Sequence, residues 1–132
     1  PLSTPIVGRG AAYADYDNNG TLDILVTENN GPAHLIKNNN FNNYLRVKIK
    51  SINSNRDGIG TKLIAITKDG RMTRKVKTGS SFMSHSETTI TFGLGENRAV
   101  DSLYVYWPNN KPDIFLDIES SQEILLVESN EN

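Results

Sequence analysis

The chain contains no cysteine, so it forms no disulfide and offers no thiolate ligand to a metal. It contains only two histidines, and this scarcity argues against a zinc site. No apolar run reaches the roughly 20 residues that a membrane-spanning helix needs, and no signal peptide is recognisable, so we expect no membrane insertion. The chain starts at Pro1 without a methionine, and we expect a processed product or a piece of a longer protein.

The most informative stretch is a loop in which oxygen-bearing side chains recur at every second position. Calcium prefers six to eight oxygen ligands at roughly 2.3–2.6 Å, and a chain that wraps around an ion directs alternate side chains inward. Gly20 permits the sharp turn, because glycine takes positive φ at little cost. The predicted Ca²⁺ ligands are four side chains and one backbone carbonyl: Asp15, Asp17, Asn19, the Thr21 carbonyl and Asp23.

The loop has two other interpretations. The spacing matches the first nine positions of an EF-hand loop, but Val26 stands where that loop needs a glutamate. A hairpin turn without metal is the simpler alternative, since Asn-Gly is itself a strong turn signal. We favour calcium because three carboxylates on a short loop repel one another without a cation.

The pattern along the chain predicts an all-β protein in two parts, with the boundary in the asparagine-rich segment at residues 38–43. Residues 1–40 contain three short strands around the loop, at 11–14, 22–27 and 33–38, which resemble an incomplete propeller blade. Residues 41–132 form an antiparallel sandwich or barrel of about seven strands. Those strands are expected near 45–50, 62–67, 71–77, 90–92, 101–107, 114–116 and 123–127.

Several motifs, in order along the chain, carry a resemblance to known families. They are Gly8-Arg9-Gly10 before Ala14-Asp15-Tyr16-Asp17, Asn29-Asn30-Gly31-Pro32-Ala33, Asn55-Arg56-Asp57-Gly58-Ile59-Gly60, Gly79-Ser80-Ser81-Phe82-Met83-Ser84, Thr91-Phe92-Gly93-Leu94-Gly95, and Val100-Asp101-Ser102-Leu103 before Trp107-Pro108. The chain resembles the end of an FG-GAP/VCBS repeat followed by an ASPIC/UnbV domain. His85 departs from the pattern, in which glutamine is expected. The resemblance implies a secreted or cell-surface location, a calcium loop, an interaction role and the rest of a β-propeller upstream.

Basic side chains provide a candidate ligand surface. Most of them fall between residues 44 and 78, where only Asp57 and Asp69 are acidic. Alternation predicts that two strands direct cations outward: Arg46, Lys48 and Lys50 from one, and Arg71, Lys75 and Lys77 from the other. If the strands share a sheet, this face attracts an anionic polysaccharide; alternatively, the acidic remainder of the chain neutralises it. No nucleic acid is expected, because no recognition helix, zinc knuckle or RNA-binding aromatic motif is present.

Three smaller features have both a functional and a structural interpretation. Arg56 and Asp57 could bind a ligand, although Asp-Gly also builds a tight turn, and we favour the turn. Tyr104 and Tyr106, on one face of a strand, could stack on a sugar or brace a neighbouring cation, while Trp107 faces the core. The serines around His85 lack the Gly-x-Ser-x-Gly elbow, so we expect a polar loop rather than a catalytic site.

The sequence therefore favours a non-catalytic, secreted or cell-surface binding or adhesion module with a calcium loop, which recognises carbohydrate or protein. Two alternatives stay open: a structural cap of a β-propeller without a ligand of its own, and an accessory domain of a larger secreted enzyme.

Overall fold

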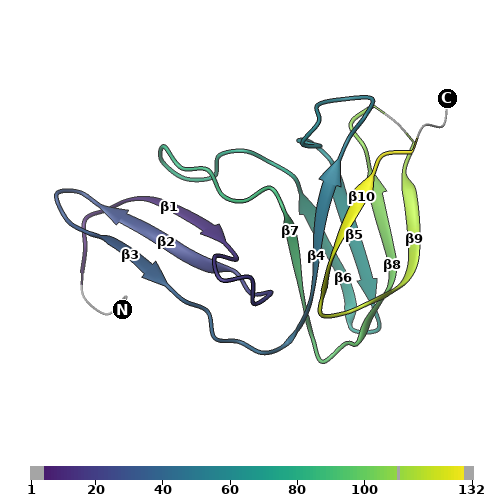
Figure 1. Cartoon of the computed structure of the whole chain (residues 1–132), viewed down its shortest axis with the longest axis horizontal. Coiled ribbons are helices and arrows are strands. Elements are labelled where there is room, and N and C mark those ends of the chain that lie inside the picture. Colours follow the sequence, from purple (N-terminus) through teal and green to yellow (C-terminus); the bar gives the residue numbers. More distant parts are fainter. Residues whose placement is uncertain (1–4, 110, 130–132) are drawn as a thin grey trace.

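The computed structural model describes residues 5–109 and 111–129, which form ten strands in three sheets. A small sheet formed by the first strands stands beside a larger two-sheet body (Figure 1). The described part of the chain contains no helix, and hence no helix that could span a membrane. The predicted all-β class is confirmed, and the larger body is sandwich-like, without a closed barrel among the residues described.

The small sheet is an antiparallel meander of β1 (Gly8–Ala14), β2 (Asp23–Glu28) and β3 (Ala33–Ile36). Gly20 lies in the β1–β2 connection with a φ of 88°, which glycine adopts readily. A Cβ at this position would lie 2.0 Å from the Tyr44 ring. Glycine is therefore needed both for the turn and for close packing against the larger body.

The larger body contains the remaining seven strands, as predicted. One sheet has the order β10-β4-β7, comprising β10 (Gln122–Val127), β4 (Asn43–Lys50) and β7 (Ile90–Gly95). The other has the order β6-β5-β8-β9, comprising β6 (Gly70–Lys75), β5 (Lys62–Thr67), β8 (Ala99–Tyr106) and β9 (Asp113–Glu119). β10 runs parallel to β4, which corrects the predicted antiparallel arrangement for this pair; the chain reaches β10 by crossing from β9 in the other sheet, so no hairpin joins the paired strands. The other pairings are antiparallel.

The core lies between these two sheets. Leu45, Phe92 and Leu103 are fully buried there, on alternating positions of their strands. Trp107 is buried as predicted, and its indole Nε1 donates a hydrogen bond of 2.7 Å to Asp113. This apolar centre sets which face of each strand points outward.

The two basic strands lie in different sheets, so they do not form one cationic surface. β4 is flanked by β10 and β7, whereas β6 is paired with β5 through the turn at Asp69 and Gly70. The condition for a shared basic face is therefore not met. Alternation correctly gave the outward residues of β6, but it carries no information about which strands are neighbours.

A long connection from β6 to β7 covers the free edge of β1. Ser81 Oγ accepts a hydrogen bond from the Ala11 amide (3.1 Å), and Ser86 Oγ accepts one from the Tyr13 amide (3.2 Å). The Glu87 amide in turn donates to the Tyr13 carbonyl oxygen (3.1 Å). Unpaired edge groups are satisfied in this way, and the small sheet is fixed to the larger body.

The asparagine-rich linker from β3 to β4 is a chain of side-chain-capped turns. Asn38 Oδ1 accepts a hydrogen bond from the Asn40 amide (3.1 Å), and Asn40 Oδ1 accepts one from the Asn42 amide (3.0 Å). Asparagine favours such turns because its side chain reaches the amide two residues ahead. The segment predicted as the boundary between the two parts thus has a defined internal structure.

Candidate metal centre

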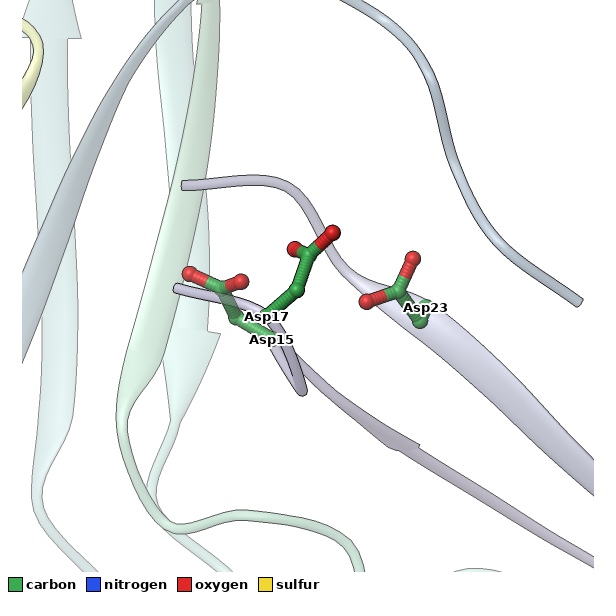
Figure 2. A group of neighbouring side chains, drawn as sticks. All are labelled: Asp15, Asp17 and Asp23. Atoms are coloured by element: carbon green, nitrogen blue, oxygen red, sulfur yellow. The ribbon is translucent and has the colours of Figure 1, made fainter. Parts of the chain in front are cut away.

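Three carboxylates converge where the β1–β2 loop meets the start of β2. Asp15, Asp17 and Asp23 each offer an oxygen, and these oxygens all lie within 4.8 Å of one another (Figure 2). Asp15 is 8% exposed and Asp23 is 2% exposed, so this is not a solvated acidic patch. Bringing like charges together away from water is unfavourable unless cations or hydrogen bonds compensate.

Backbone amides account for part of that compensation. Asp15 accepts hydrogen bonds from the amides of Asn19 (3.0 Å) and Gly20 (2.8 Å). Asp23 accepts one from the Tyr16 amide (3.2 Å) and one from the Asn38 amide (2.8 Å). These bonds preorganise the loop, because each carboxylate is oriented by the chain that surrounds it.

The other two predicted ligands are the Asn19 side chain and the Thr21 carbonyl, and these two residues are joined through the Thr21 amide and hydroxyl. Asn19 Oδ1 accepts hydrogen bonds from the Thr21 amide (2.8 Å) and the Thr21 hydroxyl (2.6 Å). That hydroxyl also lies 3.0 Å from the Asn38 carbonyl oxygen, to which it can donate instead. Rotating the hydroxyl toward Asn38 would free one lone pair of Asn19 for a cation.

Lys37, which directly follows β3, forms an ion pair with Asp17 Oδ2. The hydrogen bond from its ammonium lowers the pKa of Asp17 below the ordinary 3.8, and the same bond raises the pKa of Lys37 above 10.5. The other oxygen, Asp17 Oδ1, is buried and receives no hydrogen bond from the described residues. A buried carboxylate oxygen without a donor, among two further carboxylates, fits a hard cation.

Arg46 was predicted to face solvent, and this is wrong: the residue is only 5% exposed. Its Nη1 and Nη2 donate to the two carboxylate oxygens of Glu87 at 2.8 and 2.9 Å. Its Nε lies 3.2 Å from Glu123 and 3.5 Å from Asp15. The side chain does point away from the sandwich core, but that part of the sheet is covered by the β6–β7 connection and by the β1–β2 loop at residues 15–22, here called the metal loop because it carries the candidate ligands.

The two remaining cations of β4 differ in their surroundings. Lys48 Nζ lies 2.6 Å from Glu123 Oε1, while Lys50 is exposed. Lys48 and Lys50 border a shallow depression of about 270 Å³ together with Arg56 and Asp57. The chain bearing Arg56 and Asp57 is fixed by Asn55, whose side chain bonds the Ile59 amide (2.7 Å) and carbonyl (2.9 Å), in agreement with the structural interpretation of this turn.

On the second sheet, Arg71 and Lys75 are exposed on β6, and Lys77 is exposed just after it. Tyr106 is directly opposite Lys62 on β5, whose ammonium lies 4.6 Å from the ring centroid. The interpretation in which a tyrosine braces a neighbouring cation therefore holds for Tyr106. Tyr104 is opposite Ile64 and Ile114 on the same sheet.

The Arg46 cluster and Lys37 were not recognised in the sequence. Glu87 and Glu123 are 41 and 77 residues from Arg46, and the sequence around β4 gives no sign that they contact it. Lys37 could have been suspected, because the predicted meander returns its third strand beside the loop.

Comparison with known families identifies the class of protein. The family model described as "ASPIC and UnbV" matches residues 51–132, so the chain belongs to the ASPIC and UnbV family, as the sequence motifs had suggested. The match begins just after β4, so the metal loop lies outside it.

The chain is similar to cartilage acidic protein 1 from Xenopus tropicalis, at 33% identity over 110 residues, which cover 79% of this chain and 17% of that protein. It is similar to the Homo sapiens protein of the same name at 31% identity over 110 residues, covering 79% of this chain and 16% of that protein. The chain thus spans about one sixth of the length of the curated relatives it matches.

Replacing Arg46 with methionine should lower the free energy of unfolding by roughly 3–5 kcal/mol, because buried carboxylates then lose their cation. Urea unfolding would measure the change. Lys75→Met, which removes an exposed cation from β6, is the matched control and should shift stability by less than about 0.5 kcal/mol. Equal small effects of both substitutions would show that the Arg46 cluster contributes little.

The free energy of unfolding should also fall as the pH is lowered, because Glu123 becomes protonated. The hydrogen bond from Lys48, followed by that from Arg46, lowers the pKa of Glu123 below 4.5. A depressed pKa gives stability that is complete above the ordinary value and is lost as the pH falls through the folded value. The melting temperature of Glu123→Gln should be lower than that of the unsubstituted chain at pH 7, and the two melting temperatures should approach each other near pH 3. Glu96→Gln, an exposed site without an ion pair among the described residues, should show no such convergence.

Proposed function

We propose that this chain is a non-catalytic, extracellular or cell-surface binding module that carries a calcium site and recognises carbohydrate or protein. The observation that carries the proposal is the convergence of Asp15, Asp17 and Asp23, whose oxygens lie within 4.8 Å of one another. Carboxylates are the ligands that Ca²⁺ prefers, and Asp17 Oδ1 lacks a donor among the described residues.

The charge balance around the loop supports a divalent cation. The connected cluster contains five carboxylates, from Asp15, Asp17, Asp23, Glu87 and Glu123. Three basic groups reach it, namely Arg46, Lys37 and Lys48. The two negative charges left over equal the charge of one calcium ion, and binding it would relieve the remaining repulsion.

The hydroxyls near His85 support a binding role rather than a catalytic one. Ser81 and Ser86 accept hydrogen bonds from the β1 backbone, so they serve to attach the small sheet. His85 is exposed, and a nucleophilic serine would need a base oriented by a third group. The relatives' names associate them with cartilage, which supports a secreted or cell-surface location for this chain.

A structural cap of a β-propeller is the second candidate, because the small sheet exposes apolar side chains. Ile24 and Leu25, consecutive on β2 and therefore on opposite faces, are 42% and 41% exposed, and Leu35 on β3 is 50% exposed. A repeat unit covers such faces by stacking on its neighbours. In this proposal the small sheet is the end of an FG-GAP/VCBS blade. A cap would stabilise a longer chain yet retain no ligand in a glycan screen.

Calcium should bind weakly, with a Kd on the order of 10⁻⁴–10⁻³ M, as in other extracellular modules. Isothermal titration with millimolar calcium should give a saturable heat, and Asp17→Ala should abolish it. Asp101→Ala, at an exposed acid of β8, is the control and should leave the heat unchanged. A chain that gives no heat, or an Asp17→Ala variant that binds normally, would refute the site.

Lys37→Met should strengthen calcium binding by about twofold to fivefold, because the tethered ammonium competes with calcium for Asp17. The same titration measures this difference. Lys68→Met, which removes an equal charge from the exposed β5–β6 turn, should change the affinity much less. Weaker binding after Lys37→Met would mean that Lys37 supports the site instead of competing for it.

A further inference from the structure

We propose that a cleft at the junction of the small sheet and the sandwich binds one acidic saccharide unit, through a carboxylate or sulfate group. The cleft has a volume of about 220 Å³ and is bordered by the metal loop, the asparagine linker and the starts or ends of β4, β6 and β7. This inference deepens the proposed function and rests on it, because the calcium loop forms one wall. The side chains that carry the argument are Thr21, Asn38, Asn40, Asn42, Tyr44 and Arg74.

The linker presents hydrogen-bond donors to this cleft. The Oδ1 atoms of Asn38 and Asn40 are occupied by the amides two residues ahead, at 3.1 and 3.0 Å. Their Nδ2 groups donate to no residue in the described ranges, and the same is true of Asn42 Nδ2. The Asn38 carbonyl oxygen lies 3.0 Å from the Thr21 hydroxyl, which can donate either to it or to Asn19 Oδ1. Three amide nitrogens without an acceptor among the described residues favour a ligand with several oxygen acceptors.

Arg74 supplies the charge at the opposite wall. It is paired with Leu63 in the β5–β6 register and therefore lies on the inner face of the sheet, at the open edge of the sandwich. Its guanidinium carbon is 6.0 Å from the Phe92 ring centroid, and its Nη1 donates to the Thr73 carbonyl oxygen (3.0 Å). It forms no ion pair with any acid among the residues that the structure describes. A guanidinium with free N–H groups matches carboxylate or sulfate geometry.

The size and the remaining wall favour a sugar ring over a larger ligand. The cleft is smaller than the roughly 300–1,000 Å³ typical of pockets for drug-sized molecules. Tyr44 adds an aromatic side chain beside the amides, so apolar and hydrogen-bonding surfaces adjoin, as the two sides of a pyranose require. A neutral sugar would satisfy the amides but leave Arg74 without a counter-ion.

Calcium and the acidic ligand should support each other. Gly20, Thr21 and Leu22 border both the metal loop and the cleft. Without a cation, the nearby carboxylates oppose the approach of an anion, and a bound calcium ion reverses that local potential. Because coupling between two binding equilibria is reciprocal, the acidic ligand should also tighten calcium binding.

The test is an NMR titration of the isotopically labelled full chain with three sugars: methyl glucuronide, glucose 6-sulfate and neutral methyl glucoside. In millimolar calcium, at least one acidic sugar should shift the amides of residues 38–44 and 91–93 saturably. The neutral sugar should bind about tenfold more weakly, since a charged hydrogen bond is then missing. A response to only one of the acidic sugars would support the site and identify the preferred group.

Two substitutions localise the binding. Arg74→Ala should lower the affinity for the acidic sugar about tenfold while leaving the heat of calcium binding in place. Arg71→Ala removes the same charge from the outer face of the same strand and should change the affinity less than twofold. Asn42→Asp, which places an anion in the cleft and conserves side-chain size, should abolish binding if Arg74→Ala proves unstable.

The outcomes separate this inference from the proposed function. Normal calcium binding without a response to either acidic sugar would overturn the cleft and leave the calcium module intact. Absence of calcium binding would overturn the proposed function itself. Equal losses of sugar affinity in Arg74→Ala and Arg71→Ala would reject the cleft in favour of general attraction to a basic surface. Equal sugar affinity after chelation of calcium would reject the coupling between calcium and the cleft.

Discussion

The guanidinium of Arg46 is the interaction on which the arrangement of the two parts depends. It contacts Asp15 of the metal loop, Glu87 of the long β6–β7 connection and Glu123 of β10, three segments that are far apart in the chain. Only arginine offers five donors in a fixed plane, so a lysine at this position could not serve the same partners at once. Such a buried cluster contributes little net stability in itself, but it strongly penalises any arrangement that leaves one member unpaired.

That penalty fixes the metal loop in relation to the sandwich. Asp15 is oriented from one side by its own loop amides and from the other by Arg46, while Asp17 is approached by Lys37. Arg46 contacts Asp15 and Lys37 contacts Asp17 Oδ2, so neither cation contacts Asp17 Oδ1. Among the described residues, the neighbouring amides and cations therefore compensate the three carboxylates only in part, and Asp17 Oδ1 receives no hydrogen bond.

Patterns within short stretches of sequence predicted the features that depend on neighbouring residues, namely strands, turns and the acidic loop. The period of two found the strands, Asp-Gly and Asn-Gly found turns, and the alternate oxygens from Asp15 onward found the three carboxylates that the structure brings together. Arg46 shows where this reasoning stops. Alternation correctly placed its side chain away from the core, but whether that face meets water or another part of the protein depends on contacts 41 and 77 residues away. The assignment of β4 and β6 to different sheets is likewise a long-range outcome.

The linker illustrates how composition can mislead about order. Six residues rich in asparagine suggest a flexible hinge, yet asparagine at alternate positions lets each side chain cap the next turn. The same capping occupies Oδ1 of Asn38 and Asn40, while their Nδ2 groups donate to no residue among those described. The segment is therefore ordered by its own hydrogen bonds and still offers amide donors. The linker borders the same cleft as Gly20 and Tyr44, where a side chain at position 20 would collide with the Tyr44 ring. Its free amide nitrogens therefore lie at the junction between the small sheet and the sandwich.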